Sequence, residues 1–296
     1  MKALEFERVR RAYTRGAEVL RSVSFSMEPG QVVGLLGKNG AGKTTLIRLA
    51  LGMLEPQDGH VRLFGMDPRE KAVEVKRRVG YVAEDQILPP GLTVGDLLDL
   101  HRGLFPTWDP GMARDLMERF ELLRGARIRT LSKGQARRVA LLCAVAHRPE
   151  LLLLDEPASG LDPAARQEFL ETSIRLLNES GTAILFSSHY MTDVERMADR
   201  IVMVHDGTVL LDNTLDELRE GFSLSLVSRD AVPDRDVLVA LHGCLGVRVR
   251  ADAWHVVLRL PPAEAREEFR EKLGLADVPC RAIPLEDMFV ELAGGR

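Results

Sequence analysis

The chain has 296 residues, 45% hydrophobic and 28% charged, which is enough for one large globular domain with or without a smaller one. Its formal net charge of −4 argues against a protein that binds nucleic acid mainly by electrostatics, because such proteins carry a basic excess. The apolar stretches are too short to cross a bilayer, and the first residues lack the apolar core of a secretion signal. The three cysteines are isolated, as is typical of a reducing compartment. We therefore expect a protein of the cytosol or of the cytosolic side of a membrane.

Three strands are predicted at the start of the chain, at residues 2–11, 20–27 and 32–36. The third leads into the run Gly37-Lys38-Asn39-Gly40-Ala41-Gly42-Lys43-Thr44, which fits the phosphate-binding pattern G-x-x-x-x-G-K-[ST]. A helix is predicted immediately afterwards, so the loop lies where a helix start directs its free N–H groups at an anion. The sequence therefore predicts a site for a nucleoside triphosphate.

The residue types of this loop each have a chemical reason. Its glycines allow the backbone to wrap closely around phosphate oxygens, and Lys43 adds a full charge for the β- and γ-phosphates. Thr44 carries a hydroxyl group that suits Mg²⁺. The residues that we expect to contact the nucleotide are Gly37, Asn39, Gly40, Ala41, Gly42, Lys43, Thr44 and Thr45.

The middle of the chain changes to a helical pattern. Apolar residues recur at spacings of three and four between residues 93 and 129, and Pro106 and Pro110 divide this segment into at least two helices. Strands and helices then alternate, which indicates an α/β fold with parallel strands covered by helices on both faces. These predicted elements are a strand at residues 151–154, a helix at 164–179, a strand at 183–187 and a helix at 191–198. Further along, Asp206-Gly207 between two apolar runs predicts a hairpin.

The pattern changes again after Gly221. Predicted strands are followed by two predicted helices, at residues 262–273 and 284–292, and no chemical motif occurs among them. We interpret residues 222–296 as a small α+β accessory domain. His242 and His255 are expected to be surface or core residues rather than ligands.

Two carboxylates follow the apolar strand at residues 151–154. Asp155 lies at the carboxyl end of a parallel strand, where such sheets bind ligands, so we expect it to hold Mg²⁺ through water. Glu156 is placed to polarise a water molecule that attacks the γ-phosphate. The sequence thus predicts a hydrolytic site with Thr44 and Asp155 on its metal side.

Four further motifs carry a resemblance to a known family. Leu131-Ser132-Lys133-Gly134-Gln135 resembles the family signature L-S-G-G-Q, and Ser159-Gly160-Leu161-Asp162 matches the family's D-loop. His189, in Ser187-Ser188-His189, matches its switch histidine, and Tyr13 lies where the family keeps an aromatic residue that stacks on adenine. Taken with the phosphate loop, in this order, these motifs make residues 1–221 similar to an ATP-binding cassette (ABC) ATPase subunit.

The resemblance implies a P-loop NTPase fold of the ABC type. Such a fold has a mixed sheet core, an antiparallel β part and a helical subdomain, here at about residues 94–150. It also implies a head-to-tail dimer, in which each ATP lies between Lys43 of one copy and the signature of the other. The residues expected to complete the site are Ser132, Gly134, Gln135 and the D-loop residue Asp162, with His189 acting beside Glu156 in catalysis.

The same resemblance implies the partners. An integral membrane permease would be driven by ATP-dependent closure of the dimer, with the subunit attached peripherally at the cytoplasmic side of the membrane. The segment Phe105-Pro106-Thr107-Trp108-Asp109 resembles exporters that handle antibiotics, peptides or lipids. We therefore expect a bacterial exporter and no nucleic-acid partner.

The chain departs from the family pattern at two positions. Lys133 replaces the first glycine of the signature, where its side chain can point outward. In Gly80-Tyr81-Val82-Ala83-Glu84-Asp85-Gln86, Glu84 aligns with a glutamine that touches Mg²⁺ in the family. Glutamate can also bind Mg²⁺, so Glu84 is the expected metal residue, while a shifted alignment would give this role to Gln86.

Two other readings of the same motifs remain open at this point. A cassette protein that acts on nucleic acid or ribosomes usually carries two cassettes or a long coiled coil, whereas this chain has one phosphate loop and no heptad run. A nucleotide-binding regulator that does not hydrolyse ATP would not need Glu156 and His189. Both alternatives therefore fit the sequence less well than a transporter ATPase.

Overall fold

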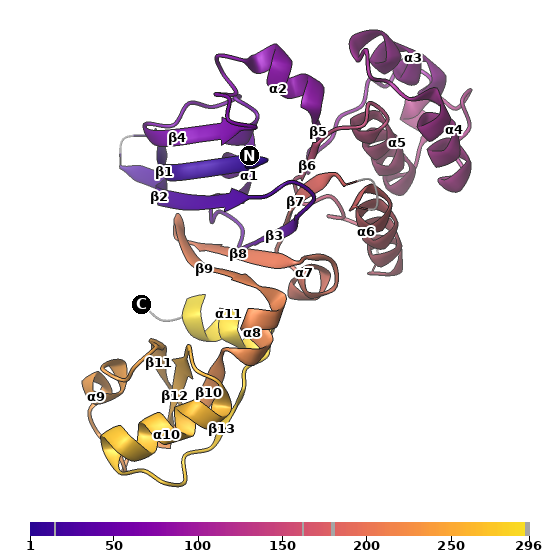
Figure 1. Cartoon of the computed structure of the whole chain (residues 1–296). Coiled ribbons are helices and arrows are strands. Elements are labelled where there is room, and N and C mark those ends of the chain that lie inside the picture. Colours follow the sequence, from indigo (N-terminus) through magenta and orange to yellow (C-terminus); the bar gives the residue numbers. More distant parts are fainter. Residues whose placement is uncertain (15, 162, 179–180, 294–296) are drawn as a thin grey trace. The chain divides into compact units, whose positions relative to one another are not determined.

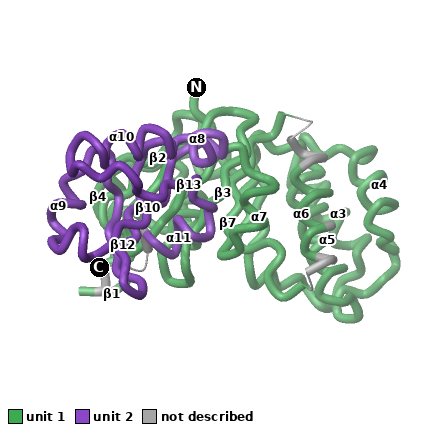
Figure 2. Tube along the Cα trace, turned by 90° about the horizontal axis from the view of Figure 1, so that it is seen from below, with its two compact units in different colours: residues 1–212 green, residues 213–296 purple. Residues whose placement is uncertain are grey.

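The structure is a computed structural model that describes residues 1–14, 16–161, 163–178 and 181–293. It divides into two compact units, Met1–Asp212 and Asn213–Arg296, which are coloured separately in Figure 2. Figure 1 labels the helices and strands of both units in chain order. Each unit is described below by itself.

The first unit contains a small antiparallel sheet near the N-terminus. Its strands lie in the order β2 (Ala17–Met27), β1 (Leu4–Thr14) and β4 (Asp58–Leu63). Leu4 of β1 pairs with Met27 on one side and with Leu63 on the other, and all three side chains are buried. The three strands lie side by side (Figure 1), and their buried apolar side chains belong to the core of the first unit.

A second, six-stranded sheet forms the centre of the first unit. The pairs β5–β6, β6–β7, β7–β3 and β3–β8 are parallel, as expected for strands joined through helices. Its strand order is β5 (Val79–Val82), β6 (Leu151–Leu154), β7 (Ala183–Ser188), β3 (Val32–Leu36), β8 (Arg200–His205) and β9 (Thr208–Thr214). The predicted α/β class, with an additional antiparallel part, is confirmed.

Both faces of this sheet are covered, which explains its nearly continuous apolar strands. On one face, Val33 and Leu35 of β3 belong to a core cluster with helix α1 (Lys43–Ala50) and the antiparallel sheet. On the other face, α7 (Met191–Met197) packs on β3 so closely that a Cβ atom at Gly34 would lie 2.4 Å from Val194 Cγ1. The phosphate loop is therefore held between a strand and a helix that are both anchored in the core.

The predicted helical segment forms two helices that pack on a third, as Figure 1 shows. Helix α3 (Val94–Leu104) begins at a Thr93–Asp96 capping box, and α4 (Pro110–Arg119) begins with proline behind the cap Asp109. Both contact α5 (Lys133–Val145), which follows the short 3₁₀ helix Ile128–Thr130. Because α5 also packs on β5, this helical group is joined to the central sheet. Helix α6 (Pro163–Asn178) follows β6 and contacts α5 and β7.

The second unit is an antiparallel sheet with helices on both of its faces. The strands lie in the order β11 (Cys244–Arg250), β12 (Ala253–Leu258), β10 (Ser223–Ser228) and β13 (Cys280–Ala282). On one face, Trp254 and Val256 form a core with Phe269 of α10 (Pro262–Leu273). On the other face lies α11 (Leu285–Ala293), which carries Glu291. The Oε1 atom of Glu291 is 3.3 Å from Nδ1 of His255. The unit is a small α+β fold, as predicted.

The structure contains the predicted hairpin but differs from the sequence-based expectation at several other places. The hairpin at Asp206-Gly207 is present, and both residues have positive φ, of 45° and 72°, as a two-residue hairpin turn requires. Helices α2 (Ala72–Arg78) and α9 (Arg235–Val239) and strand β13 were not predicted. The split between the units falls at Asp212–Asn213 rather than after Gly221, because α8 (Leu215–Glu220) groups with the second unit.

Candidate nucleotide-binding and catalytic site

The phosphate loop runs from the end of β3 to the start of α1. Gly42 is the N-cap of α1 and has a φ of 106°, and its position receives no side-chain capping bond. A Cβ atom there would lie 2.6 Å from Leu20 Cδ2, so only glycine fits without a shift of the core. The main-chain N–H groups at the start of α1 can therefore donate hydrogen bonds to an anion.

Lys43 projects back over this loop and is almost completely buried. Its Nζ donates to the carbonyl oxygens of Gly37 at 2.7 Å and Lys38 at 3.4 Å, and lies 3.1 Å from Glu156 Oε1. The side chains of Lys43 and Glu156 are 6% and 7% exposed, so this is a buried ion pair. A buried pair places the ammonium group and the carboxylate in one small volume at the loop.

Asp155 ends β6 directly beside the loop. Its Oδ1 accepts from Thr44 Oγ1 at 3.2 Å and from Ser187 Oγ at 2.8 Å, and the residue is 1% exposed. A hydroxyl and a carboxylate oxygen thus meet on one side of the phosphate loop, as the sequence predicted for the metal side. Ser187, at the end of β7, also accepts from the Glu156 main-chain N at 2.8 Å. Its role was not predicted, although its place after a strand and two residues before His189 could have indicated it.

Glu156 and His189 lie together. His189 Nδ1 is 2.9 Å from Glu156 Oε2, and Glu156 has a positive φ of 44°. This backbone conformation is uncommon for a glutamate and turns the chain sharply after β6. The two residues named as catalytic from the sequence are therefore in direct contact, with Lys43 on the other carboxylate oxygen.

A group of side chains supports His189 from behind. The Tyr190 ring is 4.0 Å from the His189 ring, and the guanidinium carbon of Arg166 lies 3.8 Å from the centre of the Tyr190 ring. Arg166 in turn is 3.4 Å from Asp193 Oδ1. Burial raises the pKa of the Asp193 carboxyl above its ordinary value, and Arg166 opposes this shift. Helix α6 is thereby connected to the segment that carries the switch histidine.

Tyr13, the predicted adenine-stacking residue, lies at the end of β1. Its hydroxyl group is 3.1 Å from Thr45 Oγ1, and its side chain is about half exposed. Arg11 approaches the ring face at 5.6 Å. The strand β1 therefore brings an accessible aromatic face next to the first turn of α1.

The signature forms the exposed start of α5. Ser132 Oγ accepts from the Gln135 main-chain N at 3.2 Å, and Gln135 Oε1 accepts from the Ser132 main-chain N at 3.0 Å. This reciprocal capping box follows from the S-x-x-Q spacing. A Cβ atom at Gly134 would have Leu161 Cδ2 as its nearest neighbour, at 3.7 Å, which leaves the backbone there accessible.

The loop after β5 distinguishes the two residues proposed for the metal-contacting role. Gln86 turns its side chain back into its own loop, where Oε1 accepts from the Ala83 main-chain N at 3.0 Å. Glu84 is exposed, and partial burial together with the carboxylates of Glu156 and Asp155 raises the pKa of its carboxyl above the ordinary value. The carboxylates of the site therefore act on the Glu84 side chain, whereas the Gln86 side chain is bound within its own loop.

Asp162, the predicted D-loop residue of the site, lies outside the residues that the structure describes. Within the described ranges no cluster of three or more His, Cys, Asp or Glu side chains could hold a metal ion, and no helix is both long and apolar enough to span a bilayer.

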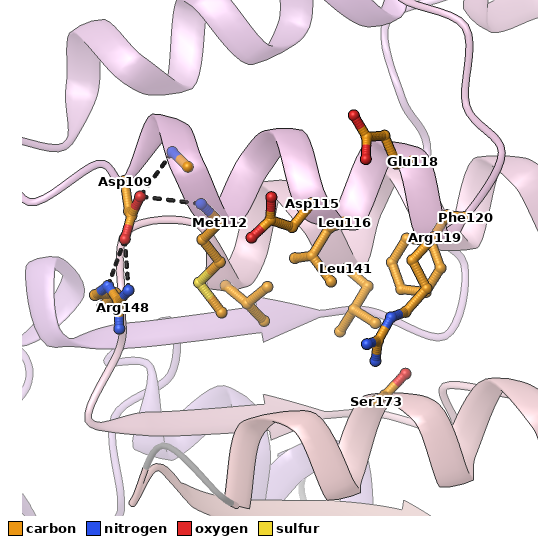
Figure 3. A pocket seen from close by; sticks show the side chains of 12 residues that line it. Asp109, Met112, Asp115, Leu116, Glu118, Arg119, Phe120, Leu141, Arg148 and Ser173 are labelled. Atoms are coloured by element: carbon orange, nitrogen blue, oxygen red, sulfur yellow. Dashed lines mark hydrogen bonds and ion pairs between the residues drawn. The ribbon is translucent and has the colours of Figure 1, made fainter.

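A separate cavity of about 670 Å³ lies against α4 (Figure 3). Arg148 closes one end through an ion pair with Asp109, the capping residue of α4, at 2.6 Å. Arg119 extends toward Ser173 at the other end, and Leu116 and Leu141 lie between them. This cavity contains none of the residues that the sequence assigned to the nucleotide, so it is not the candidate site.

Known proteins share both the sequence and the fold. Residues 20–159 match the family described as ABC transporter. The ABC transporter ATP-binding protein YtrB of Bacillus subtilis (strain 168) is 31% identical, over 95% of this chain and 95% of that protein. The Nod factor export ATP-binding protein I of Paraburkholderia xenovorans (strain LB400) is 33% identical, over 99% of this chain and 97% of that protein. A solved ATP-binding subunit of an ABC transporter has a TM-score of 0.67 at 31% identity and covers 73% of this chain and 92% of its own.

The central sheet, with a phosphate loop and a carboxylate pair at its edge, defines a P-loop ATPase of the ATP-binding cassette class. The relatives align with nearly the whole chain, so they identify the family within this class. The chain belongs to the family of ABC transporter ATP-binding proteins. It is therefore an ATP-binding and ATP-hydrolysing subunit, as its resemblance to the family implied.

Proposed function

We propose that this chain drives a bacterial exporter through ATP-dependent closure of a head-to-tail homodimer. The observation that carries the proposal is the contact of Glu156 with both Lys43 and His189 at the phosphate loop, on a chain that also exposes a capped signature helix. Export is supported by the relative named for Nod factor export, which aligns with 99% of this chain. A second relative, 34% identical over 73% of the chain, is named for linearmycin resistance.

The nucleotide phosphates would occupy the loop at the start of α1. Lys43 would exchange its ion pair with Glu156 for the β- and γ-phosphates, which frees the carboxylate beside the reacting phosphorus. The helix start and the loop N–H groups add further positive potential. The residues assigned to these contacts are Gly37, Asn39, Gly40, Ala41, Gly42, Thr44 and Thr45.

The metal side of the site would hold Mg²⁺. Thr44 and Asp155 already share a hydrogen bond, so their oxygens fit a small hard cation, and Glu84 lies in the same electrostatic field. Bound there, Mg²⁺ would neutralise charge on the phosphate oxygens. Ser187 orients the Asp155 carboxylate through its own hydroxyl, which makes the carboxylate a fixed ligand.

Hydrolysis would use Glu156 and His189 as a pair. Glu156 accepts a proton from the attacking water, and the His189 imidazole, 2.9 Å away, fixes the orientation of that carboxylate. Tyr190 and Arg166 hold the imidazole in place. The arrangement keeps a general base within a mostly buried site, where its position is well defined.

The second half of the site would come from another copy of the chain. Ser132, Gly134 and Gln135 form an exposed helix start, a second place on the chain that suits an anion. Asp162 is assigned to the same contact through its D-loop motif. One copy would supply the phosphate loop and the other the signature, so that two ATP molecules join two copies.

The membrane partner would be an integral permease, with this subunit at the cytoplasmic side. The proposal is tested by purifying the full chain with an affinity tag from detergent-solubilised membranes and by measuring Mg·ATP hydrolysis. We expect a co-purified protein with several predicted spans and ATP-dependent dimerisation in light-scattering chromatography. A monomer at saturating ATP that captures no multi-span protein would contradict the proposal.

Tyr13 gives a first specific expectation. Tyr13→Ala should weaken ATP binding by about 10-fold, because stacking of an aromatic side chain on a base contributes roughly 1–3 kcal/mol. Tyr13→Phe loses the contact with Thr45 Oγ1 but keeps the ring, so its affinity should stay near that of the native chain. Titration with a fluorescent ATP analogue measures both. Equal losses in the two variants would instead assign the effect to the hydroxyl group.

Ser132 gives a second expectation. Ser132→Ala should lower stability by about 1 kcal/mol through loss of the helix cap and should also reduce ATP-driven dimerisation. Thr93→Ala is the matched control, since Thr93 makes the same capping box at the start of α3. Both variants should lose similar stability in urea, and only Ser132→Ala should impair the dimer. Impaired dimerisation in both would assign the effect to helix stability alone.

A further inference from the structure

Arg137 makes an unusual set of contacts that the family motifs do not assign. It lies in the first half of α5, and among the described residues its guanidinium group donates to main-chain oxygens. Nη2 donates to the carbonyl oxygens of Glu84 at 2.7 Å and Ser159 at 3.0 Å. Nη1 donates to those of Pro157 at 2.9 Å and Glu156 at 3.2 Å. One side chain thus binds four carbonyl groups.

These acceptors belong to two loops that both carry residues of the site. The first loop follows β5 and contains Glu84, and the second follows β6 and runs from Glu156 to the D-loop residue Ser159. The two loops are separated in sequence by the whole helical segment. The guanidinium group therefore joins the backbones of the two loops, one of which carries Glu156.

The chemistry of the contact requires arginine. A guanidinium group carries five N–H donors in a rigid planar fork, so it can hold several carbonyl groups at fixed angles. Burial lowers the pKa of Arg137 from its ordinary value, whereas the carboxylates of Glu84, Asp85 and Glu156 raise it. The carbonyl oxygens and carboxylates around this half-buried cation compensate the cost of burying its charge. Removal of the guanidinium group would leave the carbonyl groups without a donor.

The position of Arg137 on α5 links these contacts to the signature. The exposed start of the same helix is the capping box Ser132–Gln135, which lies less than two turns away. A helix moves as a rigid rod over so short a distance, so a displacement at its start reaches the guanidinium group and both loops. The signature end and the catalytic end of one chain are connected through a single side chain.

We propose that Arg137 is a positioning residue that couples engagement of the signature to the placement of Glu84 and Glu156. This role rests on the proposed function, because it needs a nucleotide at the signature. When the signature of one copy closes on the nucleotide of its partner, α5 would carry Arg137 with it. Arg137 would then set the backbone on which Glu156 stands. Nucleotide binding at the chain's own phosphate loop would not depend on it.

The test compares the full-length native chain with Arg137→Gln, Arg137→Lys and the control Arg124→Gln. Arg124 lies in the same helical segment but pairs with Asp99 at the surface. We expect kcat of Mg·ATP hydrolysis to fall about 100-fold in Arg137→Gln, since a displacement of about 1 Å can have this effect. The dissociation constant of a fluorescent ATP analogue should stay within about twofold. Arg137→Lys should recover part of kcat, and Arg124→Gln should behave as the native chain.

The outcomes separate this proposal from the one on which it rests. A native chain that hydrolyses no ATP would overturn the proposed function, whereas an active native chain with unchanged kcat in Arg137→Gln would overturn the coupling role alone. Parallel losses of nucleotide affinity, kcat and unfolding temperature would also overturn it, because they indicate a structural role. Should Arg137→Gln fail to fold, Arg137→Lys decides the question, and kcat equal to that of the native chain refutes the coupling.

Hydrogen exchange gives a second test of the coupling. Addition of a non-hydrolysable ATP analogue should slow amide hydrogen exchange at residues 132–135, 84–86 and 156–159 together. Arg137 donates to the backbone of Glu84 and of residues 156–159, and residues 132–135 begin the helix that carries it. The bound nucleotide would also lie beside Glu84 and Glu156, so joint protection supports the coupling when Arg137→Gln keeps the protection of residues 132–135 and loses part of it at 84–86 and 156–159. Protection of residues 132–135 without the other two segments would overturn it.

Discussion

Replacement of Glu156 by glutamine should abolish most ATP hydrolysis while leaving ATP binding intact. Glu156→Gln keeps the shape of the side chain but removes its ability to accept a proton, and general-base catalysis contributes roughly 10²–10⁴-fold. The variant should therefore hydrolyse ATP at least about 100-fold more slowly. Because the proposed dimer separates after hydrolysis, its ATP-bound form should accumulate. Phosphate release and light-scattering chromatography measure the two effects.

The chain offers a matched control for this substitution. Glu150 precedes β6 and Glu156 follows it, but Glu150 forms a surface ion pair with Arg78 at 2.6 Å and its side chain is 56% exposed. Glu150→Gln should leave hydrolysis and dimerisation unchanged, since surface pairs contribute about 0–1 kcal/mol. If Glu156→Gln retained hydrolysis within about threefold of the native rate, Glu156 would not be the general base.

The fold was predictable where sequence patterns are strong. The buried strands β3 and β6 coincide with the predicted ranges, because each is a short apolar run next to a motif. Helix α2 was missed because only Val75 is buried in it and Lys71 provides no side-chain cap. The three-residue strand β13 is too short to show an alternation, and it forms only through pairing with β10.

The site was predictable where the chemistry lies in consecutive residues. The contacts of Lys43, Asp155 and His189 follow from motifs whose places at strand ends bring them to one edge of the sheet. The contribution of Arg137 depends on hydrogen bonds to main-chain carbonyl oxygens, and such acceptors leave no mark in the sequence. A residue that holds a backbone in place can therefore be found only from the folded chain.

Lys43→Met should lower both the affinity for ATP and the stability of the folded protein. Loss of a charged hydrogen bond to phosphate removes about 1.5–3 kcal/mol, which corresponds to a loss of at least about 10-fold in ATP affinity. In buffer without nucleotide, the variant leaves Glu156 buried without its cation, and breaking a buried pair in this way costs about 3–5 kcal/mol. Thermal denaturation without nucleotide should show a lower midpoint than the native chain. Lys76→Met, a substitution at an exposed position of α2, should show neither effect.

A double variant separates the charge effect from the loss of packing. In Lys43→Met with Glu156→Gln, neither buried charge remains, so much of the stability lost in Lys43→Met should return while ATP affinity stays low. Stability would then respond to the second substitution while ATP affinity would not, which the loss of packing around a methionine cannot produce. If the double variant were no more stable than Lys43→Met, the ion pair at 3.1 Å would not be the source of the destabilisation. The buried pair would then matter only for binding phosphate.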